Sequence, residues 1–126
     1  MIEKVALDEV AAGLDEFWSQ CVVGEANGSL LKVAKGIRST TWHTHEDQEE
    51  VLLVTGGRLV VQLRSGDVTL DTGEMLVVPR GVEHCPVAEE EVHLLVIGRD
   101  ITSNAAGGKP AWSYRQDGSP DSAPHR

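Results

Sequence analysis

The stretch Trp42–Gly57, WHTHEDQEEVLLVTGG, decides how this chain is interpreted. It contains two alternating histidines, His43 and His45, then four acidic residues and an apolar run that ends at a glycine pair. Residues two apart on an extended strand point the same way, so both imidazoles can face one cavity. Neutral imidazoles with a nearby carboxylate suit first-row divalent ions. The pattern predicts a metal site, with a polar edge strand entering a solvated acidic loop as the alternative.

Length and charge narrow the class of protein. A chain of 126 residues forms one domain with its own core. The 20 Asp and Glu outnumber the 11 Lys and Arg, and the net charge of -9 disfavours nucleic acid and anionic membranes as partners. No apolar run approaches the roughly 20 residues of a membrane span, and the N-terminus carries acids where a signal peptide carries positive charge. We therefore expect a cytoplasmic protein with reduced cysteines, Cys21 and Cys85.

Short strands separated by glycine turns dominate the chain. Apolar residues at helical spacing predict one helix over residues 3–18, which covers one sheet. Strands are predicted over residues 20–25, 29–34, 51–54, 58–64, 67–71, 75–78 and 92–97. Residues 75–78 are wholly apolar, so we expect them to be buried on both faces. About eight such strands indicate an antiparallel sandwich or barrel.

Residues 103–126 have a different composition, rich in Gly, Pro, Ser, Asp and Ala. We expect about the last ten to be disordered, and the aromatic segment 111–114 to pack on the barrel or on a second subunit. His125 carries no signal. The expected organisation is one domain over 1–102, with the barrel over about 20–100, and a tail over 103–126.

A second informative stretch is Gly73–His84, GEMLVVPRGVEH. Gly73 permits a turn before a buried strand, and Pro79 fixes the strand exit. Gly81 allows a positive φ that sends the chain back and delivers His84 to the mouth of the barrel. A lone histidine after such a turn is more often structural, but His43 and His45 make a ligand role for His84 the favoured interpretation.

Together the two stretches resemble the motifs of the cupin superfamily. The first motif maps onto Gly36, His43, His45, Glu49 or Glu50, and Gly56 or Gly57. The second maps onto Gly73, Pro79, Gly81 and His84, with Ala88 where Asn is common. The match covers residues 36–88. The Trp-His-x-His opening and the Pro-Arg-Gly-Val-Glu-His turn are similar to those of small single-domain cupins labelled mannose-6-phosphate isomerase-like, a label from which no isomerase activity follows.

The resemblance implies an all-β fold, an antiparallel double-stranded β-helix or jelly-roll barrel, with a short N-terminal helix. It implies a divalent transition metal (Fe, Mn, Zn or Ni) held by His43, His45, Glu50 and His84, with Glu49 as the less favoured alternative to Glu50. It also implies a homodimer, with Phe17, Trp18, Cys21 and residues 111–114 as candidate interface elements. Outside the ligand set, Cys85 is interpreted as a buried filler and His93 as a satisfied core histidine rather than a cavity contact. Trp42 is expected to pack on the barrel exterior or at a subunit interface.

Two classes of function fit these residues. The first is a metal-dependent enzyme of the dioxygenase or isomerase type, acting on a small organic acid or sugar at an open coordination position. Its apolar pocket is expected to be lined by Leu52, Val54, Val61, Val77 and Leu95. The second is a non-catalytic module that binds a small metabolite and holds a structural or adventitious metal. A shared fold does not select between them.

Overall fold

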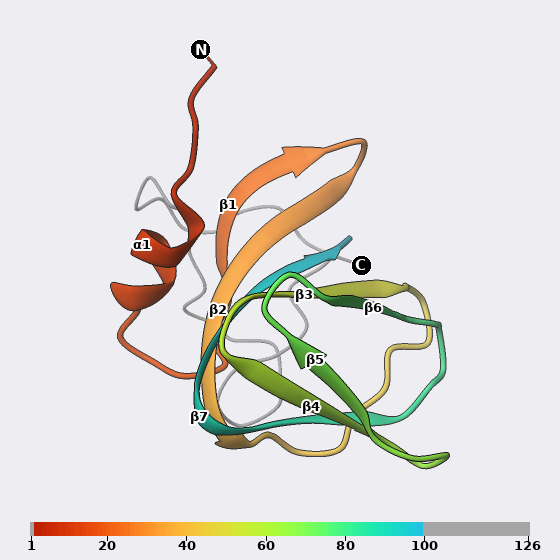
Figure 1. Cartoon of the computed structure of the whole chain (residues 1–126). Coiled ribbons are helices and arrows are strands. Elements are labelled where there is room, and N and C mark those ends of the chain that lie inside the picture. Colours follow the sequence, from red (N-terminus) through yellow and green to blue (C-terminus); the bar gives the residue numbers. More distant parts are fainter. Residues whose placement is uncertain (1, 100–126) are drawn as a thin grey trace.

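A computed structural model describes residues 2–99 of the chain (Figure 1). Within these residues there are one helix and seven strands. The elements are α1 (Leu7–Ala12), β1 (Cys21–Ala26), β2 (Ser29–Ser39), β3 (Glu50–Gly56), β4 (Arg58–Leu63), β5 (Val68–Asp71), β6 (Met75–Val78) and β7 (His84–Gly98). Every pairing between strands is antiparallel, and the strands curl into a barrel, so the predicted all-β jelly roll is confirmed.

The long strand β7 joins the two layers of the barrel. One layer has the strand order β1-β2-β7-β3-β6, and the other is built by β4 and β5. Residues 84–87 of β7 pair with β4, whereas residues 93–97 pair with β3. The sequence predicted only the second half of this strand, over residues 92–97. Pro86 and the exposed acidic run Glu89–Glu91 conceal the first half, because both are typical of loops.

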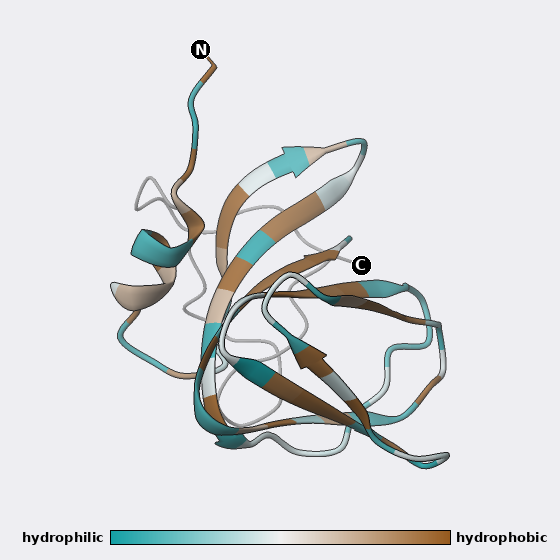
Figure 2. Cartoon of the chain, viewed as in Figure 1, coloured by the Kyte–Doolittle hydropathy of each residue, from teal (hydrophilic) through white to brown (hydrophobic). Residues whose placement is uncertain are grey.

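Alternating residues of the strands fill the barrel. The buried core contains Trp18, Leu52, Val54, Leu59, Val61, Leu70, Val78, Ala88, Val92, Leu94 and Val96. Figure 2 shows the corresponding hydrophobic segments along the strands. Leu52, Val54 and Val61, three of the residues predicted to line a pocket, face inward and belong to this packed core. Val77 on β6 and Leu95 on β7 belong to the same predicted set, but alternation along each strand turns their side chains outward. Leu95 packs beneath α1 on the outer face of the sheet.

The N-terminal segment is less helical than predicted. Helix α1 ends at Gly13, well short of residue 18, and its apolar face packs on Val33 and Leu95 on the outside of the sheet. Trp18 follows with a φ of 67° and lies in the barrel core, where its Nε1 donates a hydrogen bond to the carbonyl of Ile37 (3.0 Å). Trp18 and Cys21 are both buried, so the prediction that they form a subunit interface is wrong. The indole is used to close the barrel instead.

Strand β6 is not buried on both faces. Met75 and Val77 are 54 % and 43 % exposed, and β6 pairs only with β3, at an edge of the sheet. An apolar run cannot by itself distinguish a central strand from an edge strand with a bare outer face. Strand β2 also departs from its predicted end, because it continues past Gly36 through an irregularity at Arg38, whose φ is 61°.

Predictions made for residues 103–126 lie outside the described residues. In the part of the chain that the structure describes, no helix has the length and apolar character needed to cross a membrane.

Gly36 allows the Trp18 ring to lie closer to the backbone of β2 than a residue with a Cβ would permit. A Cβ built on Gly36 would lie 2.4 Å from the Trp18 ring. We expect Gly36→Ala to lower the free energy of unfolding by roughly 1–3 kcal/mol, because the ring must move out of a packed core. Chemical denaturation measures this change.

Gly13→Ala is the matched control. Gly13 has a φ of -86°, and a Cβ there would be no closer than 3.5 Å to its nearest neighbour. Equal stability of the Gly36→Ala variant and the wild type would contradict this account of the Trp18 packing.

Candidate metal centre

Two segments far apart in sequence meet at one end of the barrel. The backbone N–H of His43 donates to the carbonyl of His84 (3.0 Å), and the N–H of His84 donates to the carbonyl of His43 (2.9 Å). This isolated antiparallel bridge places both side chains on one face, with ring centroids 4.3 Å apart. His45 joins them, with its ring centroid 5.0 Å from that of His43 and 5.4 Å from that of His84.

The turn after β6 holds the same connection in place. Gly81 has a φ of 74°, as the turn prediction requires, and its N–H donates to the carbonyl of His45 (2.9 Å). The backbone therefore fixes His43, His45 and His84 together, although His43 and His45 lie outside any regular strand.

The hydrogen bonds of two rings determine which nitrogen is available. Nδ1 of His43 lies 2.8 Å from the carbonyl oxygen of Thr41, and Nδ1 of His84 lies 2.9 Å from that of Val82. A carbonyl only accepts, so each Nδ1 carries the proton and each Nε2 keeps its lone pair. Such a bond on the second nitrogen is the usual arrangement for a metal-ligating histidine.

The Nε2 atoms of His45 and His84 are buried and have no hydrogen-bond partner. A buried polar atom without a partner is costly and needs a physical reason. Ligand atoms of His43, His45 and His84 all lie within 4.8 Å of one another, so the three can hold one metal ion. A divalent ion would satisfy both nitrogens.

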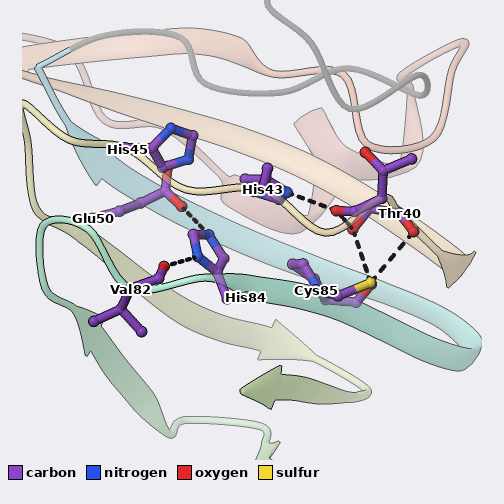
Figure 3. Close-up of polar contacts among 9 residues, drawn as sticks. Thr40, His43, His45, Glu50, Val82, His84 and Cys85 are labelled. Atoms are coloured by element: carbon purple, nitrogen blue, oxygen red, sulfur yellow. Dashed lines mark hydrogen bonds and ion pairs between the residues drawn. The ribbon is translucent and has the colours of Figure 1, made fainter. Parts of the chain in front are cut away.

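A buried carboxylate lies beside the histidines. Glu50, the first residue of β3, is 3 % exposed, and its carboxylate lies between two rings, 3.7 Å from Nε2 of His84 and 3.9 Å from Nε2 of His45 (Figure 3). The neighbouring Glu49 is exposed. Of the two glutamates that fit the motif, Glu50 is therefore the one that the fold brings to the cluster.

The histidines at the mouth favour their neutral form. Burial lowers the pKa of His43, partly offset by the Thr41 carbonyl, and the neighbouring His84 lowers it further. Burial also lowers the pKa of His45; Glu50 opposes this shift, while the other two histidines and Lys32 add to it. Only a neutral imidazole can donate a lone pair, so the surroundings suit metal ligation.

The remaining candidates lie away from the cluster. The Cys85 thiol is buried and donates to the carbonyl of Thr40 (3.3 Å), in agreement with its interpretation as a filler (Figure 3). His93 is not in the cavity. Its Nε2 lies 2.9 Å from Glu91 and its Nδ1 3.4 Å from Asp8, so it is satisfied as expected, but by carboxylates on the outer surface.

Sequence reasoning missed two buried polar residues on the inner side of the barrel, Lys32 and Gln48. Lys32 is 0 % exposed. A signal was present, because Lys32 interrupts an otherwise hydrophobic run, Leu30–Ala34, along β2. Lys32 lies two residues from each of the buried Leu30 and Ala34, so its side chain points to the same, inner face of the sheet.

Comparison with known proteins agrees with this geometry. The family model described as "Cupin domain" matches residues 29–98. A cupin-2 domain protein from Shewanella frigidimarina is 35 % identical, with a TM-score of 0.71 over 74 % of this chain and 91 % of that one. A protein from Neisseria meningitidis is 30 % identical, with a TM-score of 0.68 over 76 % of this chain and 98 % of that one. No curated protein matches the chain.

A more distant structure has the same fold. Hydroquinone 1,2-dioxygenase from Sphingomonas, solved with 4-hydroxybenzoate bound, is 17 % identical, with a TM-score of 0.67 over 91 % of this chain and 79 % of that one. At this identity the likeness extends to the fold alone.

The lowered pKa values of His43 and His45 predict a pH dependence of the metal-free protein. As the pH falls through about 6.5, the unfolded chain takes up protons at these two positions before the folded chain does. Their contribution to stability is therefore complete above this pH and is lost on acidification. Urea unfolding in the presence of a chelator, from about pH 7.5 to about pH 5, measures it.

The double variant His43→Gln, His45→Gln is the control for all other titrating groups. We expect its unfolding free energy to fall less steeply over the same interval. An identical slope in the two proteins would show that these imidazoles do not resist protonation in the folded state.

Proposed function

This chain belongs to the cupin family, and on that premise we propose that it is a metal-dependent enzyme acting on a small organic acid or sugar, of the dioxygenase or isomerase type. The observation that carries the proposal is the convergence of three imidazoles, two with buried Nε2 atoms that make no hydrogen bond, beside a buried carboxylate. The proposed ligands are His43, His45, Glu50 and His84. A divalent ion in this set supplies Lewis acidity and an open coordination position.

The exposure of the ligands favours an enzyme over a module with a structural metal. Structural metal sites are closed, whereas catalytic sites keep an accessible position. Here His84 is fully buried, but the side chain of His45 is 15 % exposed, and His43 is also only half-buried. A substrate would therefore enter from the side of His43 and His45 and meet the apolar core behind the cluster.

Each ligand has a defined task in this scheme. The carbonyls of Thr41 and Val82 hold the rings of His43 and His84 in one tautomer and orientation. Glu50 adds a negative charge to three neutral donors. We further propose the mannose-6-phosphate isomerase-like subtype, supported by the Trp42–His45 opening and the Pro79–His84 turn. This subtype assigns no reaction.

The reaction type is tested by turnover. Protein purified without a histidine tag is analysed for metal, reloaded with Fe(II) or Mn(II), and screened in two ways. Oxygen uptake is followed with hydroxylated aromatic and aliphatic acids, and aldose–ketose exchange is followed by NMR with sugars and sugar phosphates. Turnover that depends on the metal supports the enzyme. Saturable ligand binding without turnover across both panels would favour the non-catalytic module.

We also propose that the protein is a homodimer. The outer face of the first layer carries two rows of apolar residues, in cross-strand register. They are Leu31, Ile97, Val51 and Val77 in one row, and Val33, Leu95, Leu53 and Met75 in the other. Helix α1 covers the Val33–Leu95 end, but Met75 and Val77 on the edge strand β6 remain exposed. An exposed apolar patch at a sheet edge is typical of an interface.

A cytoplasmic location is proposed from the cysteines. Cys21 and Cys85 form no disulfide, and both are buried. Thiols that stay reduced in a small domain fit a reducing compartment.

The two adjacent glutamates provide a matched test of the ligand set. We expect Glu50→Gln to lower metal affinity strongly, because it removes a buried carboxylate next to two ligand nitrogens, and Glu49→Gln to leave it unchanged. His84→Ala should abolish stoichiometric binding. Elemental analysis and competition with a chromogenic chelator measure both effects.

Circular dichroism of each variant serves as the folding control. Full metal retention in Glu50→Gln, with loss in Glu49→Gln, would transfer the ligand role to Glu49. Retention in both, together with retention in His84→Ala, would remove the metal centre.

Multi-angle light scattering tests the dimer proposal. The wild type should show twice the monomer mass, and Val77→Glu should shift the equilibrium to monomer, because it places a charge in the apolar patch. Thr69→Glu, on an exposed position of β5, is the control and should remain dimeric. A monomeric wild type at micromolar concentration would refute the proposal.

A further inference from the structure

Strand β2 carries a fully buried lysine on the inner side of the barrel. Lys32 lies opposite Val22 on β1 and opposite Val96 on β7, and Val96 lies opposite Leu52 on β3. All four residues are at most 3 % exposed. Cross-strand partners share a face of the sheet, and Leu52 and Val96 belong to the barrel core, so Lys32 points into the barrel.

The same register brings Lys32 close to the proposed metal centre. Glu50 lies two residues before Leu52 and faces the same side. Only β7 separates the strands of Lys32 and Glu50, a span of about 10 Å between their backbones, which two long side chains can bridge. The β7 residue opposite Leu30, in the row next to Lys32, is Gly98, which has no side chain.

The charges of the buried groups explain what Lys32 can do. An imidazole must be neutral to ligate a metal, and the opposite charges of Lys32 and Glu50 would offset each other, so the four proposed ligands together with Lys32 would carry no net charge. A divalent ion then leaves two uncompensated positive charges in a region of low dielectric constant. Such a site gains most from a ligand that is itself negatively charged.

The remainder of the protein does not favour anions. The net charge is -9, and Glu46, Asp47 and Glu49 are exposed on the segment that leads to Glu50. Without a local positive charge, this surface would repel a carboxylate from the mouth. Lys32 is fully buried, so solvent screens its charge little.

We propose that Lys32 is a specificity-determining residue that selects a small ligand bearing a carboxylate for the open position of the metal centre. This inference rests on the proposed metal-dependent function and narrows its ligand class to small organic acids, at the expense of neutral sugars. Lys32 acts through its charge behind the cluster, and the ligand enters past His43 and His45.

The test compares two probes of nearly equal shape. Oxalate is a dianion, and oxamide is its neutral counterpart. Both are titrated calorimetrically into the Mn(II)-loaded wild type, Lys32→Met and Lys35→Met. Met matches the unbranched lysine stem and removes the charge. Lys35→Met is the control, because Lys35 lies on the same strand with its Nζ 5.0 Å from the centroid of the Phe17 ring.

We expect the wild type to bind oxalate and to prefer it to oxamide. Lys32→Met should retain one Mn(II) per chain, bind oxalate about tenfold more weakly or worse, and keep its affinity for oxamide. Lys35→Met should match the wild type. Retained metal with unchanged oxalate affinity in Lys32→Met would overturn the proposal, as would loss of metal in that variant, since Lys32 would then serve only to place Glu50.

Failure of the proposed metal centre is distinguished from failure of this inference. If the wild type binds no Mn(II), the proposed function is contradicted before any probe is added. Should Lys32→Met not fold, Lys32→Gln is used, and the wild type still decides the ligand class. Equal affinity of the wild type for oxalate and oxamide would overturn the charge selection without any variant.

Discussion

The reciprocal backbone bridge between His43 and His84 is the contact on which the proposed site depends. It ties the connection between β2 and β3 to the beginning of β7, next to a further backbone hydrogen bond from Thr40 to the carbonyl of Pro86. Because an antiparallel bridge places both side chains on one face, the backbone brings the two imidazoles together before any ligand does. The further bond from Gly81 to the carbonyl of His45 adds the third ring to the same arrangement. The metal site is thus a consequence of strand geometry and is largely pre-formed.

The barrel has two chemically different parts because one strand serves both layers. The second half of β7 carries Val92, Leu94 and Val96 into the hydrophobic core closed by Trp18. Its first residue, His84, belongs to the polar part, with Glu50 at the start of β3 and Lys32 on β2. Buried polar groups are tolerated when they satisfy one another or a ligand. These buried polar groups gather next to His43, His45 and His84, the only group among the described residues that could hold a metal. Such a gathering is expected of a functional site and not of a core.

Features encoded locally could be predicted from the sequence, and features that depend on strand pairing could not. The spacing of His43 and His45 and the turn at Gly81 depend on a few neighbouring residues. Alternation places Glu49 and Glu50 on opposite faces, and the preference for Glu50 comes from the resemblance to small cupins. In contrast, the first half of β7 resembles a loop until its pairing with β4 is known. The exposure of Met75 and Val77 depends on β6 being an edge, and the inward direction of Lys32 depends on the register of β2.

The charge pattern of the polar part also bears on the stability of the site before a metal binds. A buried carboxylate or ammonium alone would be strongly destabilising, because little solvation replaces that of water. Glu50 and Lys32, on strands separated only by β7, offset each other, and burial keeps the pKa values of His43 and His45 low, so that no further charge enters. The metal-free centre is then neutral as a whole, and its remaining cost is two imidazole nitrogens without partners. A divalent ion would remove that cost and introduce positive charge. The binding of a small molecule at the open coordination position would then depend on its charge as well as on its shape.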